Sequence, residues 1–232
     1  MIRAALCPNE PLPPAEAAVV VDVIRATTTA VALLEAGALE LWLAPDHETA
    51  LALKGEGFLI AGETAGLRPP GFDLGNSPRE ALAAPVAGKR VVMSTTNGTR
   101  AAHRAADRAR KVALGSLWNL SAVARWARGK DPLLLVAAGK EGRWGLDDAY
   151  VLGALLEKLG SGEGDGCRAA RTLFHSFPDA REALAASEAA RALQAVGLEA
   201  DVRAAAETDR SQVVPVLQRR EGPYLVFRRS GS

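Results

Sequence analysis

Six short apolar runs, separated by segments rich in helix-forming residues, constrain the fold of this chain most strongly. They cover residues 17–23, 39–44, 57–63, 89–94, 111–117 and 132–139. Their apolar character is nearly continuous, which is typical of strands that are buried on both faces. The alternation of such strands with helices predicts an α/β fold with a mostly parallel sheet flanked by helices.

The C-terminal part of the chain has a different pattern. The stretch SGEGDG, residues 161–166, predicts a flexible connection, and residues 167–200 predict a wholly helical region. Residues 212–220 and 222–229 then predict a terminal strand pair. Pro215 favours an edge position for the first of these strands, because proline cannot donate a ladder hydrogen bond.

A chain of 232 residues is long enough for one large domain or two small ones. We expect an α/β core over residues 1–160 that carries the active-site loops. Residues 161–232 would add a helical segment and terminal strands that pack on this core, or the two parts would form one continuous domain.

Composition excludes several partners. The formal net charge of +1 and the 5% aromatic content argue against a nucleic-acid partner. No apolar run approaches the ~20 residues of a membrane span, and the proline-broken N-terminal segment does not read as a signal peptide. We therefore expect no membrane partner and a cytoplasmic location. Cys7 and Cys167 alone support neither a disulfide framework nor a zinc site.

Several catalytic motifs are missing from the sequence. It contains no G-x-x-x-x-G-K-[ST] loop, no G-x-G-x-x-G, no G-x-S-x-G and no H-E-x-x-H. His47, His103 and His175 lie on helix-like segments with charged neighbours, so we expect them at the surface. Neither cysteine has the setting of a nucleophile, which disfavours phosphatases that use cysteine or histidine.

Polar clusters follow four of the predicted strands. They are DVIRATTT from Asp22, GET from Gly62, STTNGT from Ser94 and AAGKEGRWGLDD from Ala137. In open α/β sheets, ligands bind beyond the carboxyl ends of the strands. The clusters therefore predict one active-site rim, although polar loops and helix caps would explain each cluster alone.

The STTNGT cluster predicts an anion site. Its hydroxyls and free backbone N–H groups lie between a strand and a helix, as in many anion cradles. Close approach of the backbone to an anion predicts a positive φ at Asn97 or Gly98. Alternatively, Thr99 is only the N-cap of the following helix.

Asp22 ends a buried run, where an aspartate is costly unless it is paired or binds a metal. Arg25 could form an ion pair with Asp22. Alternatively, its guanidinium could donate two hydrogen bonds to a phosphate or sulfonate, together with the N–H groups of the next helix, which begins near Thr27 and Thr28.

Glu63 ends another run in the same way, and the long loop beyond it offers Asn76 and Ser77. Asp147 and Asp148 either cap a helix or join Asp22 and Glu63 in an oxygen-only site suited to Mg²⁺. We expect the carboxylates of Asp22, Glu63 and Asp148 to converge, with Asp147 as the helix cap.

The four clusters, in this order, resemble the 2-phosphosulfolactate phosphatase family. The matching segments are VVVDVIRATTT, GETAGLRPPGFDLGNSP, STTNGTRA and AAGKEGRWGLDDAYVLGALLEKL, and a weaker match continues toward the C-terminus. The resemblance implies hydrolysis of 2-phospho-3-sulfolactate to 3-sulfolactate and phosphate with Mg²⁺, a step of coenzyme M biosynthesis. It also implies an oligomer, for which we expect a homodimer.

These observations together define the expected site. The catalytic residues would be Asp22, Arg25, Glu63 and Asp148, and the metal ligands Asp22, Glu63, Asp147 and Asp148. The anionic phosphoester would contact Arg25, Thr27, Thr28, Asn76, Ser77, Ser94, Thr95, Thr96, Asn97, Gly98, Thr99 and Gly139. Phosphoryl transfer depends chiefly on positioning and charge stabilisation, so no nucleophilic side chain is required.

Two positions depart from the family pattern. The chain has Ala137-Ala138 where a cysteine is frequent, and Asp147-Asp148 where Glu-Asp is usual. Neither change removes a carboxylate. A phosphatase acting on another small phosphorylated hydroxy acid, or a non-catalytic anion-binding protein, remains the alternative.

Overall fold

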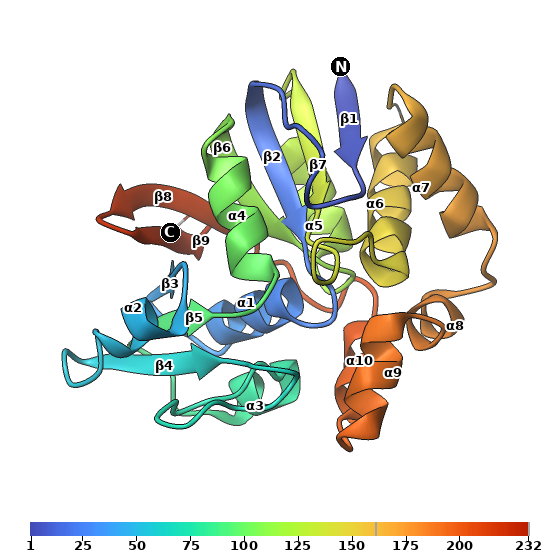
Figure 1. Ribbon diagram of the computed structural model, residues 1–232. Helices are drawn as coiled ribbons and strands as arrows, with labels where there is room; N and C mark the ends of the chain where they lie inside the picture. Colours follow the sequence, from blue (N-terminus) through green and yellow to red (C-terminus); the bar gives the residue numbers. More distant parts are fainter. Residues whose placement is uncertain (161, 232) are drawn as a thin grey trace.

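The computed structural model describes residues 1–160 and 162–231, and its centre is one sheet of nine strands (Figure 1). The strand order is β1-β7-β2-β6-β8-β9-β3-β5-β4. The bounds are β1 Ile2–Ala5, β2 Ala15–Val21, β3 Glu40–Leu43, β4 Phe58–Gly62, β5 Arg90–Ser94, β6 Ala109–Gly115, β7 Leu133–Ala137, β8 Pro215–Glu221 and β9 Tyr224–Arg229. Most neighbouring strands are parallel, which confirms the predicted fold class.

The sheet contains two parallel groups. Strands β1, β7, β2 and β6 form the first group, and β3, β5 and β4 form the second. The terminal hairpin β8–β9 joins them, with β8 antiparallel to β6 and β9 antiparallel to β3. Three successive antiparallel pairings reverse the strand direction, so the two groups run in opposite senses across the sheet.

Helices cover both faces of the first group. Ala18 and Val20 of β2 pack in the core shared with α1 and α4, whereas Val19 and Val21 pack in the core shared with α5 and α6. The helices are α1 Ala26–Glu35, α2 His47–Leu51, α3 Pro78–Ala83, α4 Gly98–Ala106, α5 Leu120–Ala127, α6 Leu146–Leu159, α7 Asp165–His175, α8 Ala180–Ala185, α9 Glu188–Ala195 and α10 Glu199–Ala205. Among the described residues, no helix is long and apolar enough to span a membrane.

The predicted strands agree closely with the structure. The six apolar runs coincide with β2 to β7 to within two residues at either end. Strand β1 was not predicted, because four residues at the chain start carry little periodicity. The predicted connection at 161–166 includes Ser161, which lies outside the described residues.

The predicted helical region, 167–200, is not continuous. It is divided among α7, α8, α9 and the start of α10. Asp179 and Ser187 accept hydrogen bonds from backbone N–H groups at the starts of α8 and α9, so each begins a new helix. The sequence contained these caps, but its high alanine content concealed the breaks.

The edge position predicted from Pro215 is wrong. β8 lies inside the sheet, between β6 and β9. Pro215 is the first residue of the strand, a position that tolerates proline. The contact with β6 is also short, since Ala113 and Val216 form its register pair.

A buried charge cluster attaches the terminal hairpin to β3. Glu40, which is 5% exposed, accepts hydrogen bonds from Arg219 Nη1 at 2.8 Å and Arg228 Nη2 at 2.6 Å. Trp42 Nε1 donates a third bond to the same carboxylate. The hydrogen bond from Arg219 is the main cause that lowers the pKa of Glu40 to about 2, against the opposing effect of burial. The cluster therefore stabilises the junction of the two strand groups.

Glu40→Gln should lower the free energy of unfolding by about 2 kcal/mol at pH 7, because the folded state loses two charge-assisted interactions. The pKa of Glu40 is 4.5 ordinarily and about 2 in the folded protein, so its contribution is present above pH 4.5 and is lost as pH falls toward 2. Urea unfolding at pH 7 and pH 3 measures this difference. Glu56→Gln, at an exposed position, is the control, and equal stability of both variants at pH 7 would contradict the assignment.

Candidate active site

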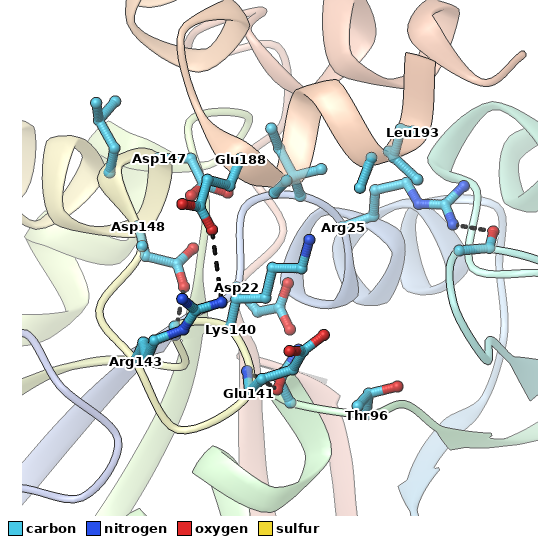
Figure 2. A pocket seen from close by; sticks show the side chains of 18 of the residues that line it. Asp22, Arg25, Thr96, Lys140, Glu141, Arg143, Asp147, Asp148, Glu188 and Leu193 are labelled. Atoms are coloured by element: carbon cyan, nitrogen blue, oxygen red, sulfur yellow. Dashed lines mark hydrogen bonds and ion pairs between the residues drawn. The ribbon is translucent and has the colours of Figure 1, made fainter. Parts of the chain in front are cut away.

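A cavity of about 810 Å³ lies where the loops that follow β2 and β7 meet the loops that follow β4 and β5. All four predicted polar clusters contribute to its lining, with Asp22, Glu63, Thr96 and Asp148 as examples. Helix α9 forms a further wall (Figure 2). The prediction that the four clusters lie together is therefore correct. The reason given for it is wrong, because the clusters follow strands of two parallel groups and not of a single parallel sheet.

Three aspartates are buried in this cavity. Asp22 follows β2 and is 7% exposed, while Asp147 and Asp148, in the first turn of α6, are 5% and 3% exposed. Figure 2 shows their side chains around the same part of the cavity. Burial disfavours ionisation of these carboxyl groups, and the nearby charges of Arg25 and Lys140 oppose that effect only in part.

The carboxyl groups influence one another. Burial raises the pKa of Asp22 to about 7, a backbone N–H bond from Ala26 opposes this, and the charges of Asp147 and Glu63 raise it further. Burial also raises the pKa of Asp147 to about 6. The pKa of Asp148 is raised well above its usual value by burial and then by the charges of Asp147 and Asp22. A cation in the cavity would remove this mutual repulsion.

Asp148 holds two strand ends together. Its Oδ1 accepts from Val23 N at 2.8 Å, just after β2, and its Oδ2 accepts from Gly139 N at 2.9 Å, just after β7. The N-cap of α6 is Gly145, without a side-chain cap, so the predicted capping role of Asp147 is wrong. Both aspartates lie in the first turn, where the helix dipole favours negative charge.

Glu63 joins the cavity from the second strand group. Its Oε1 accepts from Thr96 N and its Oε2 from Gly66 N, both at 2.9 Å. The carboxylate therefore organises the loops after β4 and β5. Its charge acts on Asp22, and Asp22, Glu63 and Asp148 line one cavity, but among the described residues they do not form the predicted set of metal ligands.

The donor set is suited to a hard cation, but it is not a complete protein cage. Within residues 1–160 and 162–231, no three His, Cys, Asp or Glu side chains are close enough to form a three-ligand metal group. Mg²⁺ commonly uses one or two carboxylates and completes its shell with water and substrate phosphate. The residues present fit that mode of binding.

The loop from Ser94 to Thr99 divides into structural and exposed hydroxyls. Thr95 Oγ1 accepts from Thr99 N at 3.2 Å, and Thr99 Oγ1 donates to Thr95 O at 2.9 Å. Each of these two buried side chains therefore forms a hydrogen bond with a backbone group of the other residue. Asn97 is the N-cap residue of α4, and the predicted N-cap role of Thr99 is wrong. Thr96 is exposed and lines the cavity together with Asn97.

Gly98 is required for a different reason than predicted. Asn97 has a φ of −120° and Gly98 is absent from the positive-φ residues, so neither adopts the left-handed conformation expected of the loop. A Cβ on Gly98 would lie 2.5 Å from Ala26 Cβ and 2.6 Å from Asp22 Oδ2. The missing side chain allows α4 to pack directly against Asp22.

Arg25 has a partner that the sequence did not reveal. It is 3% exposed, and its Nη1 lies 2.7 Å from Asp201 Oδ2, while its Nη2 donates to Gly66 O. The alternative pairing with Asp22 is not what the structure shows, and the predicted fork onto an anion meets a guanidinium whose two Nη atoms already have partners, although Arg25 does line the cavity. Ser77 Oγ donates to the other oxygen of Asp201, so the helix α10 holds two residues of the predicted site.

The other expected anion contacts differ in position. Thr27 Oγ1 and Thr28 Oγ1 donate to backbone carbonyls, of Asp22 and Val23, and neither side chain lines the cavity. Gly139 and Asn76 do line it. Asn76 is 4% exposed, and its Oδ1 is one of the buried polar atoms without a hydrogen-bond partner. This acceptor is available to a donor such as bound water or a ligand hydroxyl.

Sequence reasoning missed His47. Its Nδ1 lies 3.0 Å from Ser94 Oγ and its Nε2 lies 2.8 Å from Thr64 Oγ1, so it connects the ends of β5 and β4. It is half-buried rather than a surface residue, as is His103. Only proximity in the fold identifies these contacts, because strand β4 and helix α3 lie between His47 and Ser94 in the chain.

Comparisons with known proteins agree with this architecture. The family model described as 2-phosphosulpholactate phosphatase matches residues 4–220. A protein of Thermus thermophilus is 54% identical over 235 residues, covering 99% of both chains, and one of Deinococcus radiodurans is 47% identical over 224 residues, covering 93% of this chain and 92% of the other. A third, of Thermotoga petrophila, is 39% identical over 219 residues, covering 94% and 95%. All three bear the name probable 2-phosphosulfolactate phosphatase.

The protein is accordingly a phosphatase, that is, a phosphoric monoester hydrolase. The chain belongs to the 2-phosphosulpholactate phosphatase family, as its sequence motifs indicated.

When a chelator keeps the protein free of metal, its free energy of unfolding should fall as pH rises. The pKa of Asp22 is 3.8 ordinarily and about 7 in the folded protein, so between these values the folded state binds more protons than the unfolded chain. We expect a melting temperature roughly 5–10 °C lower at pH 8 than at pH 5. Asp22→Asn should reduce this difference, whereas Glu56→Gln should not. An unchanged pH dependence in Asp22→Asn would contradict the cluster's role.

Proposed function

We propose that the protein hydrolyses 2-phospho-3-sulfolactate to 3-sulfolactate and phosphate, with Mg²⁺ as cofactor. The observation that carries the proposal is the cluster of Asp22, Asp147 and Asp148, buried in a cavity that also contains cationic side chains. The names of the relatives support the substrate. We further propose a cytoplasmic homodimer, on the resemblance to the family.

One or two of the carboxylates of Asp22, Asp147 and Asp148 would bind the metal ion, because their oxygens are hard ligands, and water and the substrate phosphate would complete its shell. When bound, Mg²⁺ offsets charge on the phosphoryl group and lowers the pKa of a coordinated water. Glu63 is less available, since each of its oxygens already accepts a backbone N–H bond.

The chain's own residues supply orientation. Asp148 fixes the loops that follow β2 and β7 through its two backbone bonds. Asn97 Oδ1 accepts from Glu141 N at 3.1 Å and so joins the hydroxyl loop to the loop after β7. Such fixed geometry favours phosphoryl transfer, which depends mainly on alignment and charge stabilisation.

Cys7 needs a separate test, because it lines the cavity although its sequence context does not predict a nucleophile. Its Sγ lies 3.4 Å from Gly142 O. A metal-dependent reaction assigns this thiol a packing role, whereas a phosphocysteine route would require it.

Phosphate release should depend on Mg²⁺ and on the aspartate cluster. Asp22→Asn should lower kcat by at least ~100-fold, because removal of a charged ligand weakens stabilisation of the transition state. Cys7→Ser should retain activity. The assay is phosphate release from 2-phospho-3-sulfolactate, 2-phospholactate and 2-phosphoglycerate, with Mg²⁺ or with a chelator.

Three other outcomes of this assay would each contradict a different part of the proposal. Preference for another phospho-acid would replace the proposed substrate. Binding of these acids without turnover would indicate an anion-binding protein, and loss of activity in Cys7→Ser alone would replace the metal-dependent mechanism.

Thr96→Val should raise KM by roughly ten-fold with little change in melting temperature, because Thr96 is exposed and lines the cavity. Thr99→Val is the matched control. It removes a buried hydroxyl that donates to Thr95 O, so it should lower the melting temperature instead. The reverse pattern would show that the loop has a purely structural role.

A further inference from the structure

The cavity contains cationic side chains as well as aspartates, and we call the surface formed by Lys140, Arg143 and Arg191 its cationic wall. Lys140 and Arg143 belong to the loop of residues 139–145 that follows β7, and Arg191 belongs to α9. All three line the cavity, and Figure 2 shows the side chains of Lys140 and Arg143 extending toward the aspartates. The cavity therefore contains two charge environments side by side.

Arg143 forms an ion pair across the cavity. Its Nη2 lies 3.8 Å from Glu188 Oε2, at the start of α9, and the two side chains are 67% and 64% exposed. A pair so exposed contributes little stability and exchanges readily with water or another anion. The guanidinium is thus held at the cavity by a partner that a stronger ligand can displace.

The proposed substrate carries acid groups besides its phosphate. Its carboxylate shares a carbon with the phosphate ester, whereas its sulfonate lies one carbon further away. In the proposed reaction the phosphoryl group lies at the aspartates, so the sulfonate needs a separate cationic partner, which the cationic wall supplies. A guanidinium fork also matches the oxygens of a tetrahedral anion better than a single ammonium does.

We propose that Arg143, assisted by Lys140, binds the sulfonate of the substrate, and that Arg143 pairs with Glu188 when the substrate is absent. This inference rests on the proposed function and identifies residues that select the substrate. Arg143 is then a specificity-determining residue, and Glu188 is an internal competitor that the sulfonate displaces.

The test compares 2-phospho-3-sulfolactate with 2-phospholactate, which lacks the sulfonate. Arg143→Gln should raise KM for the sulfonated substrate roughly ten-fold and leave kcat nearly unchanged, since the contact is equal in ground and transition states. KM for 2-phospholactate should change less than two-fold. Glu188→Gln should lower KM for the sulfonated substrate roughly two- to five-fold, because the competitor is removed.

Arg168→Gln is the control, because it removes an exposed arginine of α7 that lies outside this cavity. Equal effects of Arg143→Gln on both substrates, or none on either, would overturn the sulfonate assignment. An unchanged KM in Glu188→Gln would overturn its role as competitor.

A binding measurement separates this inference from the proposed function. Calorimetric titration with 3-sulfolactate needs no turnover, and Arg143→Gln should weaken its binding roughly ten-fold relative to Arg168→Gln. If the wild-type protein binds 3-sulfolactate in this manner but releases no phosphate from the sulfonated ester, the proposed reaction fails and the assignment of Arg143 stands. Equal affinity in both variants would overturn the assignment.

Discussion

The burial of Asp22, Asp147 and Asp148 in one cavity is the constraint on which the rest of the structure depends. Taking a carboxylate out of water disfavours its charged form, and each neighbouring charge adds to that penalty. The pKa values of all three are raised as a result. Backbone N–H groups of Val23, Gly139 and Ala26 reduce the penalty but do not remove it. The cluster is therefore costly to the protein alone, and a bound cation would make it favourable.

Distant parts of the chain keep this cluster in place. Gly98 allows α4 to lie against Asp22, and Asp148 joins the ends of β2 and β7. The C-terminal region contributes twice, because its hairpin connects the two strand groups through Glu40 and its helix α10 places Asp201 against Arg25. A buried pair such as Arg25 and Asp201 is costly to break, since removing either leaves an unpaired charge. The geometry of the cavity and the stability of the fold thus depend on the same contacts.

The sequence predicted the features that local pattern encodes. Continuous apolar runs identified β2 to β7, and the polar clusters after them identified Asp22, Glu63, Thr96 and Asp148 as cavity residues. It could not predict that a terminal hairpin separates the strands into two groups, because strand order depends on long-range pairing. It also missed Asp201 and His47, whose partners are far away in the chain. The predicted positive φ near Gly98 failed because close packing, rather than a left-handed turn, requires a glycine there.

The proposed divalent cation at the aspartate cluster would contact the phosphoryl group of the substrate. A crystal structure with Mn²⁺ and phosphate tests this most directly, because Mn²⁺ replaces Mg²⁺ at oxygen sites and its anomalous signal locates it. We expect a Mn²⁺ peak about 2.2 Å from an oxygen of Asp22, Asp147 or Asp148, with phosphate as a further ligand. A cavity that binds phosphate with no cation beside these aspartates, or a cation bound elsewhere, would contradict it.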